Sequence, residues 1–293
     1  MKIGIIGAGR VGTSFGKYIS TLCLDNYYLQ GFYSKTYENT IISANFCNTK
    51  AFKSLSELLT SSDTLFVAVS DSEIKNVWDC IDKNLIKNKI ICHFSGALSS
   101  DVFNGADSYK IYTGSIHPAY AFNDKFNSWK GLNKVIFTVE GSNVFISEIQ
   151  KLFNLTQNKI CIIDKSVKPL YHTATSMASN HLIGLVDMVV KTFEQCGFSK
   201  DVAYQIITPL MKDNLCNALD NGVVSALTGP IERGDIQIVE KHISVLNENQ
   251  LLVYKALGKQ VIEIAKEKHK NNKCLSEKHR YIERILSQWK IQF

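Results

Sequence analysis

Three polar side chains recur at intervals of four residues in the segment YHTATSMASNH: His172, Ser176 and Asn180. On an α-helix each residue turns by about 100°, so each step of four drifts by only ~40° and the three side chains share one face. Histidine titrates near neutral pH and can act as a general acid. The pattern predicts a site that protonates an oxygen as it gains negative charge, with Ser176 and Asn180 orienting the substrate.

Two other interpretations of this face stay open. Lys168 precedes Pro169 and is expected at the helix entrance, where it could replace His172 as the proton donor. Alternatively, the helix could carry a buried, hydrogen-bonded histidine among small residues chosen only for close packing.

Near the N-terminus, the segment GIIGAGRVG places glycines at Gly7, Gly9 and Gly12. The β-branched run before them predicts a strand, and the residues after them can continue as a helix. In that context the spacing G-x-G-x-x-G is typical of a dinucleotide site, whose pyrophosphate contacts the first N–H groups of the helix. We therefore also assign Arg10 and Val11 to cofactor binding, with a purely structural glycine turn as the alternative.

The second predicted strand ends at Tyr33, Ser34 and Lys35, where sites that prefer NAD usually carry a carboxylate. A hydroxyl and a cation would instead bind a 2′-phosphate, so we predict NADP(H) as the cofactor. Ser70 and Asp71 follow the strand TLFVAV and are expected near the ribose or pyrophosphate.

Three further candidates belong to the substrate site. Ser95 with Gly96, and also His117, each follow a predicted strand, on the rim where open α/β sheets bind ligands. In the turn-rich segment LTGPIERGD, Arg233 is suited to grip a carboxylate and Asp235 to cap the next helix. Each is otherwise an ordinary polar loop residue.

The order of elements predicts two domains in the 293 residues. Strands and helices alternate up to Ile163, which indicates a mainly parallel Rossmann-like sheet. From residue 165 onward the pattern is helical throughout, and a single long helix is expected from Leu170 to Gln195. We predict an NADP-binding domain over 1–164 and an all-α substrate and dimerisation domain over 165–293.

Composition narrows the function classes. The eight cysteines form no C-x-x-C pair, so we expect no metal site and mostly buried, reduced thiols. The net charge of +6 is mild, and the basic C-terminal region mixes both signs, which is typical of a solvated helix face and not of nucleic-acid binding. We expect no signal peptide, no membrane contact and a cytoplasmic location.

Taken together, these segments resemble a known family. The glycines of the N-terminal loop, HFSGALSS, SIHP, YHTATSMASN and LTGPIERGD are similar to Rossmann-like proteins with a DUF2520 domain, within the 6-phosphogluconate dehydrogenase-like group. The resemblance implies NADP binding and a helical domain that often dimerises. Some members serve as ketopantoate reductases. Conventional ketopantoate reductases carry Lys, Asn and Asn where this chain has His172, Ser176 and Asn180.

The resulting hypothesis is an NADPH-dependent reductase of a small carboxylated carbonyl compound, with 2-dehydropantoate as the best single guess. A homodimer is expected. One alternative is an imine reductase, since the N-terminal half is also similar to pyrroline-5-carboxylate reductase. Others are a non-catalytic NADP(H) sensor and hydride transfer to a deazaflavin carrier.

Overall fold

The computed structural model of this protein describes residues 1–22 and 26–288. They form two compact units, divided between His181 and Leu182. None of the helices in these two described stretches combines the length and the apolar character needed to cross a bilayer.

The first unit is built on a sheet whose strands, within the described residues, have the order β3-β2-β1-β4-β5-β6-β7-β8. They are β1 (Lys2–Ile6), β2 (Tyr28–Tyr33), β3 (Lys50–Ala51), β4 (Thr64–Val67), β5 (Ile90–His93), β6 (Tyr112–Pro118), β7 (Phe137–Gly141) and β8 (Ile160–Ile162). All neighbours pair in parallel except β6 and β7. The strand order reverses between β1 and β4, which is where doubly wound sheets bind nucleotides.

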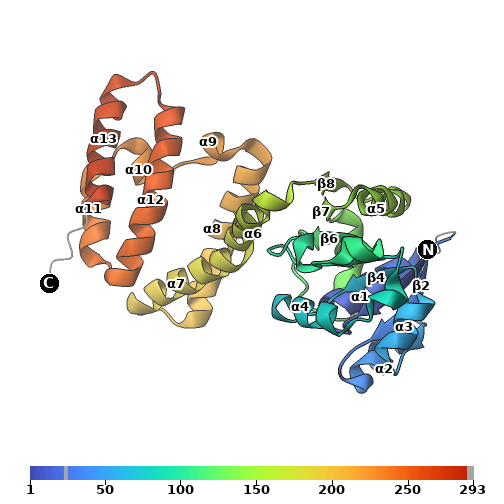
Figure 1. The fold of residues 1–293 in the computed structure, drawn as a ribbon. Helices are drawn as coiled ribbons and strands as arrows, with labels where there is room; N and C mark the ends of the chain where they lie inside the picture. Colours follow the sequence, from blue (N-terminus) through green and yellow to red (C-terminus); the bar gives the residue numbers. More distant parts are fainter. Residues whose placement is uncertain (23–25, 289–293) are drawn as a thin grey trace. The chain divides into compact units, whose positions relative to one another are not determined.

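Six helices accompany this sheet in the described part of the first unit (Figure 1). They are α1 (Arg10–Thr21), α2 (Tyr37–Phe46), α3 (Leu55–Ser61), α4 (Asp71–Cys80), α5 (Asn143–Thr156) and α6 (Lys168–Ser176). The central strands β1, β4 and β5 are apolar on both faces, as strands covered by helices on both sides must be. Phe15 of α1 packs edge-on against Phe66 of β4, which holds α1 on the sheet.

The second unit is helical. Its elements are α7 (Leu182–Gln195), α8 (Lys200–Asn221), α9 (Val223–Ala226), α10 (Pro230–Arg233), α11 (Ile236–Val245), α12 (Glu248–Lys268) and α13 (Lys273–Ser287). One small apolar cluster joins α7 and α8. A second contains residues of all four helices α10, α11, α12 and α13. Figure 1 shows α12 and α13 side by side.

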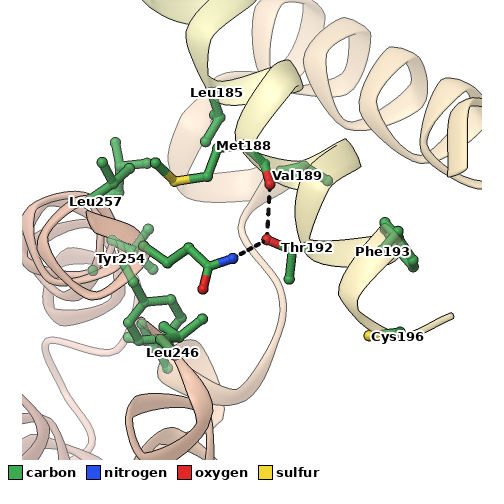
Figure 2. Close-up of a pocket in the computed structure, with 14 residues that line it drawn as sticks. Leu185, Met188, Val189, Thr192, Phe193, Cys196, Leu246, Tyr254 and Leu257 are labelled. Carbon is green, nitrogen blue, oxygen red and sulfur yellow. Dashed lines mark hydrogen bonds between the residues drawn. The ribbon is translucent and has the colours of Figure 1, made fainter. Parts of the chain in front are cut away.

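An apolar groove of about 360 Å³ lies between these two clusters, lined by residues of α7 and α12 such as Met188, Val189 and Leu257 (Figure 2). One buried amide crosses it: Nε2 of Gln250 on α12 donates to Thr192 Oγ1 at 2.8 Å, on α7. This hydrogen bond ties the two clusters of the second unit together.

The predicted fold class is confirmed: a mostly parallel Rossmann-like sheet precedes a helical region. Two details of the prediction are wrong. The expected single helix over 170–195 is interrupted by a π turn at Met177–His181, which separates α6 from α7. Among the seven described cysteines only Cys47 and Cys92 are buried. The sequence also predicts a last helix from Ser276 to Trp289, and its predicted end lies outside the described residues.

Candidate functional site

The glycine loop between β1 and α1 has the form that a pyrophosphate requires. Gly7 has φ +113°, and a Cβ there would lie 2.4 Å from the carbonyl oxygen of Ala68. A Cβ on Gly12 would lie 2.2 Å from the oxygen of Gly7, whereas Gly9 has no neighbouring atom within 4 Å. The first and third glycines therefore allow close packing, and the second borders open space.

Helix α1 begins at this open space. Its first turn holds no acidic residue, and no side chain caps it, so its first N–H groups and the positive end of its dipole face an approaching anion. Arg10 is exposed and forms no ion pair with any described residue. Val11, the next residue, is half-buried. The loop can hold a dinucleotide phosphate.

The end of β2 carries a free cation. Lys35 is exposed and makes no ion pair within residues 1–22 and 26–288. Ser34 is already used locally: its hydroxyl donates to the Thr36 carbonyl at 2.9 Å and lies 2.8 Å from Thr40 Oγ1. Lys35 thus offers charge to a 2′-phosphate, and Ser34 shapes the turn that presents it.

Hydrogen bonds of His93 and Ser95 fix the loop that follows β5. Ser95 Oγ donates to Asp71 Oδ2 at 2.7 Å and accepts the N–H groups of Ala97 and Leu98. Nδ1 of the fully buried His93 accepts the Ser95 N–H at 3.1 Å. Burial lowers the pKa of His93 to about 4, so the ring is neutral at pH 7 and can accept this bond. Asp71 therefore links α4 to the loop that carries Gly96. Ser70, exposed beside it, contacts Ser72.

A buried ion pair, formed by Lys168 and Glu140, lies next to the loop that follows β5. Glu140, at the end of β7, accepts hydrogen bonds from the backbone N–H and hydroxyl of Ser100 and from the hydroxyl of Ser115. Nζ of Lys168 lies 3.7 Å from Glu140 Oε1 and donates to Ser115 Oγ and to the carbonyl of Ser95 at 3.1 Å. Burial lowers the pKa of Lys168, and the charge of Glu140 opposes that shift.

Lys168 was expected at the entrance of the helix, within reach of either the site or bulk water, but its side chain is only 2% exposed. It reaches neither solvent nor the polar cavity described below, because all its donors point at groups from β5, β6 and β7. This geometry favours a role in positioning the strand ends.

His117 lies near the carboxyl end of β6, and one of its ring nitrogens is hydrogen-bonded. Its Nδ1 lies 2.8 Å from the hydroxyl of Tyr171 on α6, and that hydroxyl accepts from Thr138 Oγ1, also at 2.8 Å. Thr138 is the β7 partner of His117 in the antiparallel pair. The strand pairing and α6 together fix the plane of the His117 ring.

His117 and His172 meet beside Gly96. A Cβ on Gly96 would lie 2.8 Å from Nε2 of His117 and 2.8 Å from Nδ1 of His172, so no side chain larger than hydrogen fits there. Both ring nitrogens therefore lie close to the backbone of Gly96. His172 Nδ1 is buried and makes no hydrogen bond to any described residue.

A cavity of about 440 Å³ opens next to the two imidazoles. Its lining residues are His117, Ala119, Tyr120, Ala121, His172, Thr175, Ser176, Ala178, Ser179 and Asn180. The structure therefore brings the His172, Ser176 and Asn180 side chains to one cavity although the π turn interrupts their helix. No charged side chain is among these lining residues, so the cavity suits a neutral polar group such as a carbonyl.

Arg233 lies in the second unit. Its guanidinium pairs with Asp235, with NH2 at 2.9 Å and Nε at 3.0 Å from the same carboxylate oxygen. The expected capping of α11 by the Asp235 side chain is wrong, because this ion pair occupies the carboxylate. The neighbouring Glu232 accepts from His269 at 2.6 Å, which anchors the LTGPIERGD segment to the end of α12.

Sequence reasoning missed Glu140, Thr138 and Tyr171. The signal for Glu140 was a carboxylate at the end of the apolar strand sequence IFTVEG, where a buried charge needs a partner. Tyr171 stands beside His172 in the sequence, but its contact with His117 depends on the pairing of β6 with β7.

Comparisons with known proteins agree with this fold. Residues 135–261 match the family model described as "Domain of unknown function (DUF2520)". This family is the one that the motifs of the chain resemble. No curated protein sequence matches it.

Solved structures show the same overall fold. One, a protein from Thermotoga maritima, is 23% identical with a TM-score of 0.71, covering 90% of this chain and 98% of the other. A 1-pyrroline-5-carboxylate reductase from Streptococcus pyogenes is 15% identical with a TM-score of 0.57, covering 97% and 98%. A Plasmodium falciparum pyrroline carboxylate reductase with NADP bound is 12% identical with a TM-score of 0.52, covering 98% of both chains. At these sequence identities, the structural similarity establishes the fold alone.

Removing one partner of the buried ion pair should destabilise the first unit strongly. We expect Lys168→Met to cost about 3–5 kcal/mol, because it leaves the Glu140 charge buried and unpaired. The double variant Lys168→Met/Glu140→Gln should cost less than the sum of the single variants. Urea unfolding followed by the fluorescence of Trp78 and Trp129, both in this unit, measures the free energies.

The exposed pair Lys151–Glu148 on α5 provides the control, with its atoms 2.6 Å apart. Lys151→Met should change the free energy of unfolding by no more than about 1 kcal/mol, since exposed ion pairs contribute little. Equal effects of Lys168→Met and Lys151→Met would contradict the structural role assigned to the buried pair.

Proposed function

We propose that this protein is an NADPH-dependent reductase of a small carboxylated carbonyl compound, with 2-dehydropantoate as the best single candidate. The observation that carries the proposal is the polar cavity lined by His117, His172, Ser176 and Asn180, at the carboxyl end of β6 in a sheet that also bears a dinucleotide loop. A sensor that only binds the cofactor would have no use for such a cavity.

The residues present fit NADPH. The open space at Gly9 and the uncapped start of α1 suit the pyrophosphate, and Lys35 suits the 2′-phosphate. When bound, this cofactor supplies a hydride to an electrophilic carbon. The NADP complex of the Plasmodium falciparum reductase of the same fold supports this choice of cofactor.

The chain itself must stabilise and protonate the carbonyl oxygen. In our proposal His172 donates the proton that converts this oxygen to a hydroxyl, while the Ser176 hydroxyl and the Asn180 amide orient the substrate. The His172 side chain lines the cavity, and its Nδ1 is not engaged by any described residue. Such a general acid contributes about 10²–10⁴ to the rate.

The substrate carboxylate requires a cation, and none lines the cavity. Lys168 is committed to Glu140, so our proposal assigns the carboxylate to Arg233, whose side chain is 58% exposed. A bidentate guanidinium–carboxylate pair with the substrate would compete with its present pair to Asp235.

Replacement of His172 tests the reaction class. Purified protein is mixed with NADPH and a panel of 2-oxo acids that includes 2-dehydropantoate, and cofactor oxidation is followed by absorbance. We expect turnover with at least one member and a loss of about 10²–10⁴ in kcat for His172→Ala. The exposed His242 of α11 supplies the control, since His242→Ala should behave like the natural protein.

Absence of turnover with every 2-oxo acid would contradict the proposal. Turnover of a cyclic imine that survives His172→Ala would instead identify an imine reductase, because a protonated imine needs no general acid. Binding of NADPH without any turnover would identify a sensor.

The choice between the two nicotinamide cofactors depends on Lys35. We expect Lys35→Ala to weaken NADPH binding about tenfold or more and to leave NADH binding nearly unchanged, since only NADPH carries the 2′-phosphate. Titration of the cofactor fluorescence measures both dissociation constants. Lys151→Ala on α5 is the matched control, and an equal loss for both cofactors on replacing Lys35 would argue against a phosphate contact.

We further propose that the protein is a homodimer through α8. Of its 22 residues only Ala203 and Ile207 are buried, whereas Tyr204, Leu215 and Leu219, which share one face of the helix, are 43%, 47% and 76% exposed. An apolar surface of this kind on one helix is typical of a protein–protein interface.

Charge on this surface should separate the subunits. Leu215→Glu/Leu219→Glu should shift the mass measured by light scattering after gel filtration from that of a dimer to that of a monomer. Leu155 on α5, also half-exposed, is the control, because Leu155→Glu should leave the dimer intact. A natural protein that is monomeric at all concentrations would contradict this proposal.

A further inference from the structure

The second imidazole at the cavity, that of His117, has a hydrogen-bonding arrangement that sets its protonation state. Nδ1 faces the Tyr171 hydroxyl at 2.8 Å. That hydroxyl already accepts a hydrogen bond from Thr138, so its own proton is directed to Nδ1 of His117. We infer that Nδ1 is the acceptor and that the ring carries its proton on Nε2, since this arrangement gives the Tyr171 proton a partner.

The ring is also neutral at physiological pH. Burial lowers the pKa of His117 to about 4, the charges of Lys168 and His172 act in the same direction, and Asp71 opposes them. With Tyr171, whose own pKa burial raises, these are the titratable groups that face the ring. A neutral imidazole with one nitrogen engaged is a directed hydrogen-bond donor.

The free nitrogen of His117 points to the place where a ligand is expected. Nε2 makes no hydrogen bond to any described residue, although His117 lines the polar cavity. The same nitrogen and the unpartnered Nδ1 of His172 lie at equal distances from one point beside Gly96. Because Nε2 of His117 has no partner among the described residues and the ring lines the cavity, an oxygen of a bound substrate can accept its hydrogen bond.

We propose that His117 is a second catalytic residue, whose Nε2–H donates a hydrogen bond to the carbonyl oxygen of the substrate, and that Tyr171 and Thr138 are positioning residues that fix this tautomer. The inference rests on the proposed reductase function and extends it. His117 stabilises the oxygen as negative charge develops and keeps its proton, while His172 transfers one. The hydride adds to the carbonyl carbon, the proton to its oxygen, and the product is an alcohol.

There is a physical reason for His117 to keep its proton while His172 transfers one. A charged His117 beside His172 would repel the imidazolium that must donate the proton. A neutral donor avoids that repulsion and is fixed in direction before the substrate arrives, which is the condition under which a hydrogen bond lowers a reaction barrier most. Gly96 permits this arrangement, because a Cβ at this position would collide with both rings.

Nuclear magnetic resonance of the full-length, ¹⁵N-labelled protein tests the tautomer without reference to activity. Long-range ¹H–¹⁵N correlations, assigned with His117→Gln, should show His117 protonated on Nε2 alone between about pH 6 and pH 8. In Tyr171→Phe the ring should populate both tautomers, because Nδ1 loses its donor. Protonation on Nδ1, or on both nitrogens, in the natural protein would overturn the inference.

Steady-state kinetics test the catalytic part. We expect His117→Ala to lower kcat by about 10²–10³, as for loss of one oxyanion donor, with the NADPH dissociation constant unchanged. His117→Gln, whose amide can place an N–H near Nε2, should retain more activity than His117→Ala. Tyr171→Phe should lower kcat about tenfold and leave KM nearly unchanged.

The chain contains a matched control for Tyr171. Tyr254 bonds the Nδ1 of His242 at 2.9 Å in the second unit, so Tyr254→Phe removes the same kind of bond away from the cavity and should not change kcat. Unchanged kcat in both Tyr171→Phe and His117→Ala would overturn the role of His117 while the reductase function stands. Absence of turnover in the natural protein would overturn the reductase function, and the role of His117 with it.

Discussion

The buried pair of Lys168 and Glu140 is the interaction on which the rest of the site depends. Two charges that are almost wholly removed from water are tolerated only when each has several partners, and here Ser95 and Ser100 after β5 and Ser115 of β6 supply hydrogen bonds to a lysine of α6 and a glutamate of β7. The pair therefore fixes where α6 begins relative to the strand ends. Since His172 is one turn further along α6, its position beside Gly96 follows from this electrostatic anchor.

Around this anchor, the site is built from neutral groups. His93 and His117 are both buried enough to be uncharged at pH 7, and each uses that neutrality differently. His93 accepts a backbone N–H and shapes the loop that carries Gly96, whereas His117 keeps one nitrogen for the cavity. The combination favours binding of a neutral carbonyl oxygen over binding of an anion inside the cavity.

Much of the fold could be predicted because it depends on local signals. Apolar runs bounded by polar residues gave the eight strands, and the glycine spacing located the loop between β1 and α1. The π turn at Met177–His181 was not predicted, since the spacing of polar residues there fits an ordinary helix and carries no signal of a wider turn. Likewise, the burial of Lys168 could not be predicted, because it depends on Glu140, 28 positions earlier in the chain.

By itself, the sequence determined the order of strands and helices, the nucleotide-binding loop and the residues of the polar face, because these depend on neighbours within a few positions. Only the tertiary structure decided which histidine nitrogen is free, which lysine is buried and which side chains meet at the cavity. Those properties depend on contacts such as that between His117 and Tyr171, 54 residues apart. Such a contact exists only after the antiparallel pairing of β6 with β7 and the buried ion pair have brought the two segments together.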